Sequence, residues 1–140
     1  MTEGITYINP PTLSNSLAIG YSQAITARGT MVFIAGQVGS DATGKMAVGF
    51  DAEVRQALEN VRLALRACGA TTAHVTQLRY FLVGLTREWI DGLSKALRDL
   101  SMWDWTKPPA GTLVGVEKLA RPEFNIEIEL MAVIPDEHAK

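Results

Sequence analysis

Two glutamates near the end of the chain, Glu127 and Glu129, have the residue type and spacing for acid–base chemistry. They lie in residues 125–131, Asn-Ile-Glu-Ile-Glu-Leu-Met, where polar and apolar residues alternate with the period of a β-strand. This alternation places both carboxylates on one face of the strand and the apolar residues on the other. A carboxylate pair on a strand face is either solvated or part of a site that holds or moves a proton. The alternation alone leaves both interpretations open.

The segment before this strand completes a C-terminal unit. Residues 112–116, Thr-Leu-Val-Gly-Val, are rich in β-forming residues and predict a short strand. Residues 117–123 contain Pro122 and neighbouring charges, which are typical of a connection. We therefore expect two strands joined by a loop, with the glutamates on the second strand.

Earlier residues predict further strands that would position this unit. Residues 17–27 and 77–83 have strand character. Residues 30–35, Thr-Met-Val-Phe-Ile-Ala, form a continuous apolar run, which predicts a strand buried on both faces. A short additional strand is expected near residues 46–48, after a loop that contains several glycines.

Two amphipathic helices are predicted from the spacing of the aliphatic residues. The first begins at Asp51 and ends at Gly69, a residue that suits a helix C-terminus. Thr86 is placed to cap the second helix. We interpret Cys68 as a small core residue of the first helix and not as a nucleophile. The expected core stripes are Val54, Leu58, Val61, Leu65 and Cys68 in the first helix and Ile90, Leu93, Leu97 and Leu100 in the second.

The order of these elements predicts an α+β fold, with a single sheet and both helices packed on one face. Residues 1–140 are expected to form a single domain, with an irregular N-terminal arm over residues 1–16 and a tail over residues 134–140. A sheet covered on one face leaves its other face bare. A packed oligomer would cover that face.

Composition narrows the class of protein. A chain with 47% hydrophobic and 20% charged residues is typical of a globular domain. A net charge of −2 without a basic cluster gives no reason to expect nucleic acid or an anionic membrane as a partner. One cysteine, no secretory signal and no apolar run of bilayer length favour a cytoplasmic location. His74 lacks a second ligand at metal-binding spacing, so we expect no metal and no cofactor.

Six short motifs, in order along the chain, resemble those of the Rid superfamily, also known as the YjgF family. Each motif is weak alone, but the ordered set is specific and spans residues 17–135. The motifs are GYSQA (residues 20–24), VFIAGQ (32–37), RQALENV (55–61), PAGTLVGV (109–116), LARP (119–122) and IEIE (126–129).

The resemblance implies a chorismate-mutase-like fold, assembled as a homotrimer with a pocket at each of three subunit interfaces. Family members that act as enamine or imine deaminases hold the substrate carboxylate with an arginine and position the attacking water with a glutamate. By motif, Tyr21 corresponds to a pocket tyrosine, and Glu127 corresponds to the glutamate. Gly36, Thr112 and Leu113 are expected to line the same pocket.

Two positions depart from the family pattern. Gly111 stands where the arginine is usual, and Ala35 stands where serine often precedes Gly-Gln. Loss of the arginine would cost about 2–5 kcal/mol if a substrate carboxylate were left buried and unpaired. Simple 2-imino and 2-enamino acids should therefore bind poorly unless another cation substitutes. Arg79 is the candidate, because Arg121 belongs to a turn common in the family.

Trp103 and Trp105 lie in the loop that leads into the Pro-Ala motif. They either line a larger and less polar pocket or fill the subunit interface. The resemblance thus predicts a divergent Rid-type deaminase or related hydrolase that acts on a small labile metabolite, with Glu127 assisting water attack. The alternative is a trimer that binds a metabolite without turnover, as the missing arginine suggests. Ribonuclease activity, sometimes attributed to the family, ranks last because of the charge balance.

Overall fold

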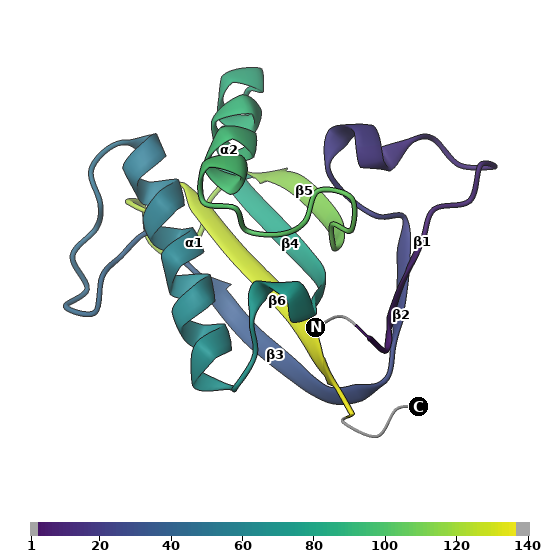
Figure 1. Ribbon diagram of the computed structural model, residues 1–140. Helices are drawn as coiled ribbons and strands as arrows, with labels where there is room; N and C mark the ends of the chain where they lie inside the picture. Colours follow the sequence, from purple (N-terminus) through teal and green to yellow (C-terminus); the bar gives the residue numbers. More distant parts are fainter. Residues whose placement is uncertain (1–2, 137–140) are drawn as a thin grey trace.

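A computed structural model describes residues 3–136 of the chain and consists of a curved sheet with two long helices and a smaller strand pair beside it (Figure 1). The elements follow in the order β1 (Ile5–Ile8), η1 (Ser16–Ile19), β2 (Ala24–Ala27), β3 (Gly29–Gln37), α1 (Phe50–Ala67), η2 (Thr72–His74), β4 (Val75–Val83), α2 (Arg87–Asp99), β5 (Ala110–Val116) and β6 (Ile126–Pro135).

The main sheet has the strand order β3-β6-β4-β5, in which β4 and β5 run parallel and the other neighbours run antiparallel. Both helices lie against one face of this sheet (Figure 1). The predicted α+β fold with helices on one face is therefore confirmed. Because β3 and β5 are the edges of the sheet, their outer backbone groups have no neighbouring strand in this sheet.

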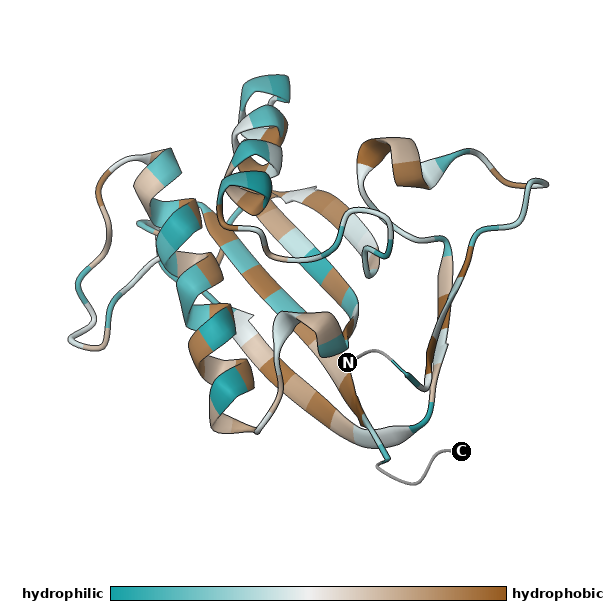
Figure 2. Cartoon of the chain, viewed as in Figure 1, coloured by the Kyte–Doolittle hydropathy of each residue, from teal (hydrophilic) through white to brown (hydrophobic). Residues whose placement is uncertain are grey.

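Alternating side chains of the strands build the core. Along β6, Ile126, Ile128 and Leu130 are buried under the helices, and the glutamates between them point to the opposite face, as predicted. Figure 2 shows this alternation of apolar and polar residues along the central strands. Leu58 and Leu65 of α1 are fully buried against them. Each such aliphatic side chain contributes roughly 1.5–3 kcal/mol to folding.

The helix ends follow the predicted capping signals. The Thr86 side chain accepts a hydrogen bond from the Trp89 backbone N–H at 3.2 Å, which satisfies a donor at the start of α2. Gly69 follows α1 with a φ of +76°, a left-handed conformation that favours glycine. Cys68 was expected in the core, but it is exposed. The prediction failed because α1 ends at Ala67, so the buried stripe of the helix stops at Leu65 and Cys68 lies in the turn that follows.

The N-terminal part differs from the predicted arm. Residues 5–8 form β1, which pairs antiparallel with β2 and gives the backbone groups of both strands partners. The strand expected over residues 17–27 is a short 3-10 helix followed by β2. The strand expected near residues 46–48 is reduced to one bridge, between Ser40 and Met46. At the other end, β6 continues to Pro135, and the rest of the predicted tail, residues 137–140, lies outside the described residues.

The face of the sheet opposite the helices carries exposed apolar side chains. Met31 and Phe33 of β3 are 58% and 68% exposed, whereas Val32 and Ile34 between them are buried. The prediction that this strand is buried on both faces is therefore wrong for the single chain. Val114 of β5 is also exposed, and strand alternation places it on the same bare face as Phe33.

Candidate functional site

A cavity of about 680 Å³ lies between α2, the edge strand β5 and the segment that joins η1 to β2. The wall formed by the sheet includes Tyr80, Gly111 and Leu113, and the helix wall includes Ile90 and Arg98. Five of the residues predicted from the sequence line this cavity, namely Tyr21, Trp105, Gly111, Thr112 and Leu113.

Hydrogen bonds to the start of β5 hold Tyr21 at the cavity. The next residue, Ser22, is buried, and its hydroxyl donates to the Pro108 carbonyl oxygen at 2.6 Å. The Ser22 backbone N–H donates to the Pro109 carbonyl oxygen at 3.1 Å. A Cβ atom on Gly111 would lie 3.6 Å from the Tyr21 Cβ, an ordinary contact distance. Position 111 therefore faces Tyr21, and its glycine leaves open the space that a side chain would take.

Trp105 forms a further wall and contacts both the C-terminal end of η1 and a cation. Gly20 has a φ of +98°, and a Cβ atom there would lie 2.9 Å from Cζ3 of the Trp105 ring. Glycine is thus required both for the backbone conformation and for the close approach of the ring. The Arg98 guanidinium carbon lies 4.2 Å from the centroid of the same ring, within the range of a cation–π interaction.

Glu127 lies outside this cavity, on the face of the sheet opposite the helices. Its half-buried side chain is directed at Gly36, where an added Cβ atom would lie 2.3 Å from Glu127 Oε2. Gly36 follows Ala35 in β3, at an irregularity in the pairing with β6. Three residues that the motifs assign to the pocket, Ala35, Gly36 and Glu127, are therefore neighbours, and they define the glutamate side of the candidate site.

Arg79 lies on the same bare face and not in the cavity. Its guanidinium Nη1 donates to Glu129 Oε1 at 3.0 Å, so this arginine already has a carboxylate partner within the chain. Arg121, in the connection between β5 and β6, lies 4.0 Å from a carboxylate oxygen of Glu123. Neither arginine lines the cavity next to Gly111.

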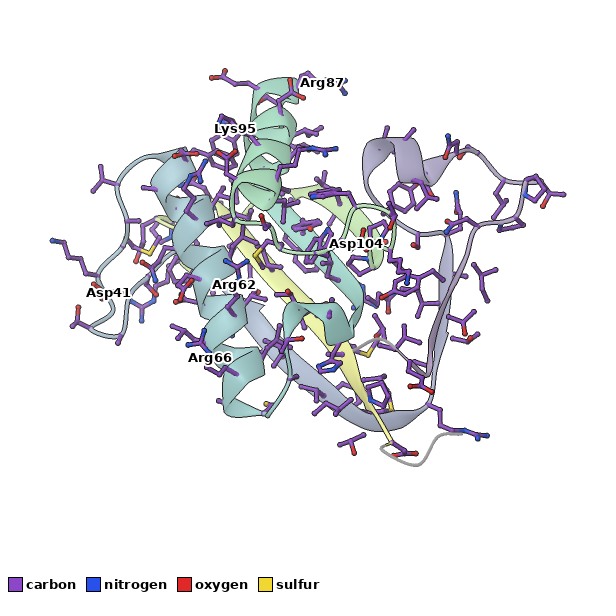
Figure 3. All side chains as sticks on the ribbon, in the orientation of Figure 1. Asp41, Arg62, Arg66, Arg87, Lys95 and Asp104 are labelled. Carbon is purple, nitrogen blue, oxygen red and sulfur yellow. The ribbon has the colours of Figure 1, made fainter. Side chains whose placement is uncertain are left out.

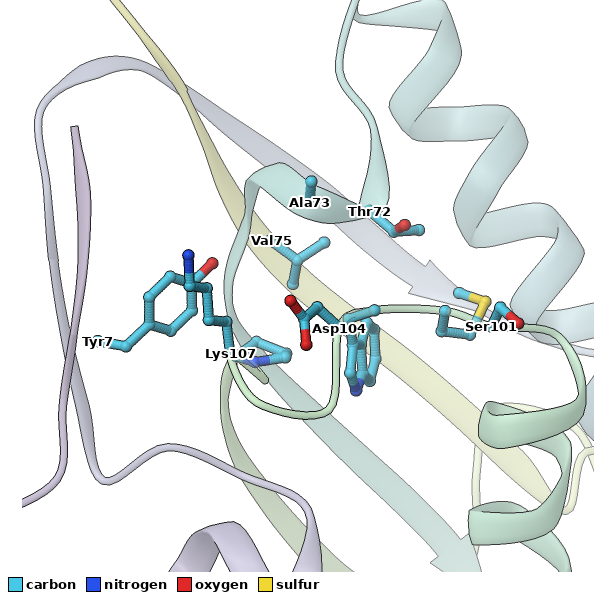
Figure 4. A pocket seen from close by; sticks show the side chains of 10 residues that line it. Tyr7, Thr72, Ala73, Val75, Ser101, Asp104 and Lys107 are labelled. Atoms are coloured by element: carbon cyan, nitrogen blue, oxygen red, sulfur yellow. The ribbon is translucent and has the colours of Figure 1, made fainter. Parts of the chain in front are cut away.

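The two tryptophans of the loop before β5 face different cavities. Trp103 is 9% exposed and lines a second cavity of about 470 Å³, which also includes Tyr7, Asp104 and Lys107 (Figure 4). Burial and the nearby charge of Asp104 raise the pKa of Tyr7. The pKa of Asp104 is lowered, chiefly by the hydrogen bond from the Thr106 hydroxyl. Trp103 therefore packs beside a site separate from the cavity that Trp105 lines.

Glu53 supports the glutamate side and was not predicted. Its carboxylate is 3% exposed and accepts hydrogen bonds from the Asn125 backbone N–H at 2.7 Å, the Asn125 side-chain amide at 2.8 Å and the Ile126 backbone N–H at 3.2 Å. These bonds fix the first residues of β6 against the N-terminal turn of α1. The sequence gives one signal, an acidic residue next to Val54 on a helix that is otherwise apolar on its inner side.

Arg98 was also missed, since the sequence draws attention to arginines close to the family motifs. Arg98 lies in the last turn of α2, seven residues before Trp105, and its role becomes visible only when the loop between them folds back and brings the two side chains together.

Within residues 3–136, no group of three or more histidine, cysteine or acidic side chains is arranged to hold a metal ion. His74 accepts a hydrogen bond from the Thr71 backbone N–H through Nδ1 and caps η2. In the same range no helix has both the length and the apolar character to cross a bilayer.

Comparisons with known proteins decide the family. The Ribonuc_L-PSP family model, described as endoribonuclease L-PSP, matches residues 13–134. The chain belongs to the Rid superfamily. This result confirms the resemblance seen in the ordered motifs.

Relatives of this Rid protein are similar along most of its length. It is 32% identical over 117 residues to the RutC family protein YjgH of Escherichia coli, with 84% of this chain and 85% of the relative covered. It is 31% identical over 114 residues to a RutC family protein of Aquifex aeolicus, with 81% and 87% covered. The crystal structure of the Rid family protein YyfB from Yersinia pestis, whose function is unknown, superposes with a TM-score of 0.83 at 32% identity and covers 94% of this chain and 99% of that one.

Proposed function

We propose that this Rid protein is an enamine/imine deaminase or a related hydrolase, with a substrate range shifted away from simple 2-imino and 2-enamino acids. One observation carries the proposal. Tyr21, Gly111, Thr112 and Leu113, which the family motifs assign to the pocket, line one cavity, although they come from two segments far apart in the sequence. A concave pocket lined by apolar and aromatic side chains with a few polar groups is the usual form of a small-molecule site.

The proposal includes a homotrimer. The exposed Met31, Phe33 and Val114 on the bare face of the sheet support it, because burial of such a face in an interface removes apolar area from water. We call the cavity of about 680 Å³ that Tyr21 and Gly111 line the Tyr21 cavity. In the single chain, Glu127 and the Tyr21 cavity lie on different sides of the sheet. In the proposed trimer the Glu127 side of one subunit meets the cavity at the β5 edge of the next. Each of the three interfaces then carries a complete site.

The proposed reaction is hydrolysis of a C=N bond. An enamine first takes up a proton from solvent on carbon and becomes the iminium ion, which an imine also forms when its nitrogen is protonated. Water then attacks the iminium carbon while Glu127 accepts a proton from it, which gives a neutral carbinolamine. Glu127 returns this proton to nitrogen and the C–N bond breaks, so that ammonia leaves. The hydroxyl oxygen gives its proton back to the Glu127 carboxylate as the C=O bond of the carbonyl product forms, and Glu127 then releases that proton to solvent. In this proposal, backbone N–H groups near Gly36 and Leu113 stabilise the charge that develops.

The absent arginine determines the expected specificity. With glycine at position 111, the β5 wall offers no guanidinium for a carboxylate next to the reacting carbon, and the vacated space admits a larger group. The same observation favours a second candidate function, a trimer that binds a metabolite without hydrolysing it.

Ammonia release from freshly generated imines and enamines, with and without a carboxylate on the reacting carbon, tests the proposal. The parent should hydrolyse members that lack this carboxylate, and Gly111→Arg should gain activity on 2-aminoacrylate because it restores the cation beside Tyr21. A parent that hydrolyses no member, together with a Gly111→Arg variant that does, would refute hydrolysis by the natural protein. Metabolite binding would then be the better account.

A further inference from the structure

The helix wall of the Tyr21 cavity carries a cation that the strand wall lacks. We propose that Arg98 binds the anionic group of the substrate, with the apolar body of the substrate against Trp105. This inference rests on the proposed function, because it assigns a substrate class to the same site. That class is imines and enamines in which the anionic group and the reacting carbon are at opposite ends of the molecule.

The geometry of Arg98 leaves its hydrogen-bond donors available to a ligand. The guanidinium lies over the Trp105 ring, with 4.2 Å from its carbon to the ring centroid, and a cation–π contact of this kind does not occupy the N–H groups with hydrogen-bond acceptors. Among the described residues, no carboxylate lies within ion-pair distance of Arg98. Arg87, which lines the same cavity, differs because its Nε lies 3.7 Å from Asp91 Oδ1.

The Trp105 ring is held so that it can position the guanidinium. Gly20, at the end of η1, has no side chain and so allows the Trp105 ring to approach the backbone there. Around the ring, the chain forms a tight turn in which Asp104 Oδ1 accepts hydrogen bonds from the Thr106 backbone N–H at 2.8 Å and from its hydroxyl at 2.6 Å. A stacked arginine loses less conformational freedom when it binds a carboxylate than a free one does. Trp105 is therefore a positioning residue for Arg98.

The opposite wall determines where the reacting group lies. Tyr80, Gly111 and Leu113 present no cation there, and Gly111 leaves room next to Tyr21. The anion is therefore bound at α2 and the uncharged C=N end points to β5, the edge that carries the family's pocket motif.

The test is isothermal titration calorimetry with two stable probes of matched shape, 3-phenylpropanoate and its neutral amide, 3-phenylpropanamide. The parent should bind the carboxylate at least about tenfold more tightly, since a hydrogen bond to a charged group is worth roughly 1.5–3 kcal/mol. Arg98→Gln should abolish this preference. Arg98→Lys keeps the charge without the planar stacking and should retain part of it.

Arg66→Gln is the matched control, because Arg66 occupies the last turn of α1 as Arg98 does in α2 but does not line the cavity. Figure 3 shows Arg66 at the end of α1 that lies away from α2. Arg66→Gln should leave the preference unchanged. Equal binding of the two probes by the parent, or equal loss in Arg98→Gln and Arg66→Gln, would overturn the assignment. Ammonia release by the parent is scored separately. A parent that prefers the carboxylate through Arg98 but releases no ammonia refutes the hydrolase and leaves the ligand class standing.

Discussion

At the scale of single residues, the contact between Gly36 and Glu127 is the tightest part of the candidate site. A Cβ atom at position 36 would lie 2.3 Å from Glu127 Oε2 and 2.6 Å from its carboxyl carbon. The Glu127 carboxylate therefore occupies the space that a side chain at position 36 would fill, so the absence of a side chain at Gly36 allows this position of the carboxylate.

Gly36→Ala should displace the Glu127 carboxylate and lower kcat by roughly tenfold or more, because a small misplacement of a catalytic group is costly. Ammonia release measures this effect, and the free energy of unfolding in urea checks that the fold is retained. Unchanged kcat in a folded variant would show that the position of Glu127 next to Gly36 does not matter for the reaction.

The sequence predicted the residues that a motif fixes locally. Tyr21, Gly111 and Glu127 each stand in a short motif that is written in the sequence, and the face of β6 on which Glu127 lies followed from alternation. The strand expected around Tyr21 did not form, because this residue lies between η1 and β2. Arg98 and Glu53 could not be predicted in the same way. Their roles depend on how α2 and α1 pack against a loop and a strand about 7 and 72 residues away, which local patterns do not encode.

At the scale of elements, the N-terminal part of α1 contacts α2 near both ends of α2. The Phe50 and Trp89 rings stack with centroids 4.0 Å apart at the N-terminal ends. At the other contact, Asp99 Oδ2 lies 2.5 Å from Lys95 Nζ and 2.8 Å from Arg55 Nη2. These contacts set the register of α2, and α2 in turn carries Arg98 to the cavity.

The Asp99 cluster predicts a pH-dependent contribution to stability. Hydrogen bonds from Lys95 and then from Arg55 hold the pKa of Asp99 below its ordinary value of 3.8. A carboxyl group with a lowered pKa in the folded state stabilises it above the unfolded-state pKa, and this stabilisation is lost as the pH falls through the folded-state pKa. Asp99→Asn should therefore unfold at lower urea concentration than the parent at pH 7, with a smaller difference at about pH 3.

Asp91→Asn serves as the control for this measurement. Asp91 lies on the same helix, but its contact with Arg87 is longer, at 3.7 Å, and both side chains are well exposed. It should change the urea midpoint less than Asp99→Asn does at pH 7. A difference between Asp99→Asn and the parent that stays constant with pH would contradict the assigned role of the Asp99 charge.

The helices themselves were predictable because capping residues and apolar stripes are local signals, as Thr86 and Gly69 illustrate. Strand β1 was not predictable, since residues 5–8 gain their strand conformation from pairing with β2 some twenty residues later. For the same reason, the apolar run of β3 was wrongly expected to be buried on both faces. An apolar run does not reveal whether the residues that pack against it belong to the same chain or to another subunit.

At the scale of the whole molecule, this bare face connects the fold to the proposed trimer. Phe33→Asp places a charge on the face that the interface is proposed to bury, where an unpaired charge is strongly unfavourable. We expect the variant to be a monomer and to lose activity, because each site would then lack its second half. Size-exclusion chromatography with light scattering measures the mass directly.

Leu63→Asp is the matched control, because Leu63 is an exposed aliphatic residue on the outer side of α1, away from the sheet. It should remain a trimer. A parent that is a monomer, or a Phe33→Asp variant that remains a trimer, would contradict the proposed assembly.

The most direct test of the account is the rate of ammonia release by Glu127→Gln beside Glu129→Gln, on the best imine substrate of the parent. Both acids lie on the same face of β6, but Glu129 is paired with Arg79 and Glu127 is directed at Gly36. The account predicts that Glu127→Gln lowers kcat by roughly 100-fold or more, as expected for loss of a general acid–base, while Glu129→Gln stays within a few-fold of the parent. Equal activity of the parent and Glu127→Gln would contradict the central claim that Glu127 carries the hydrolysis.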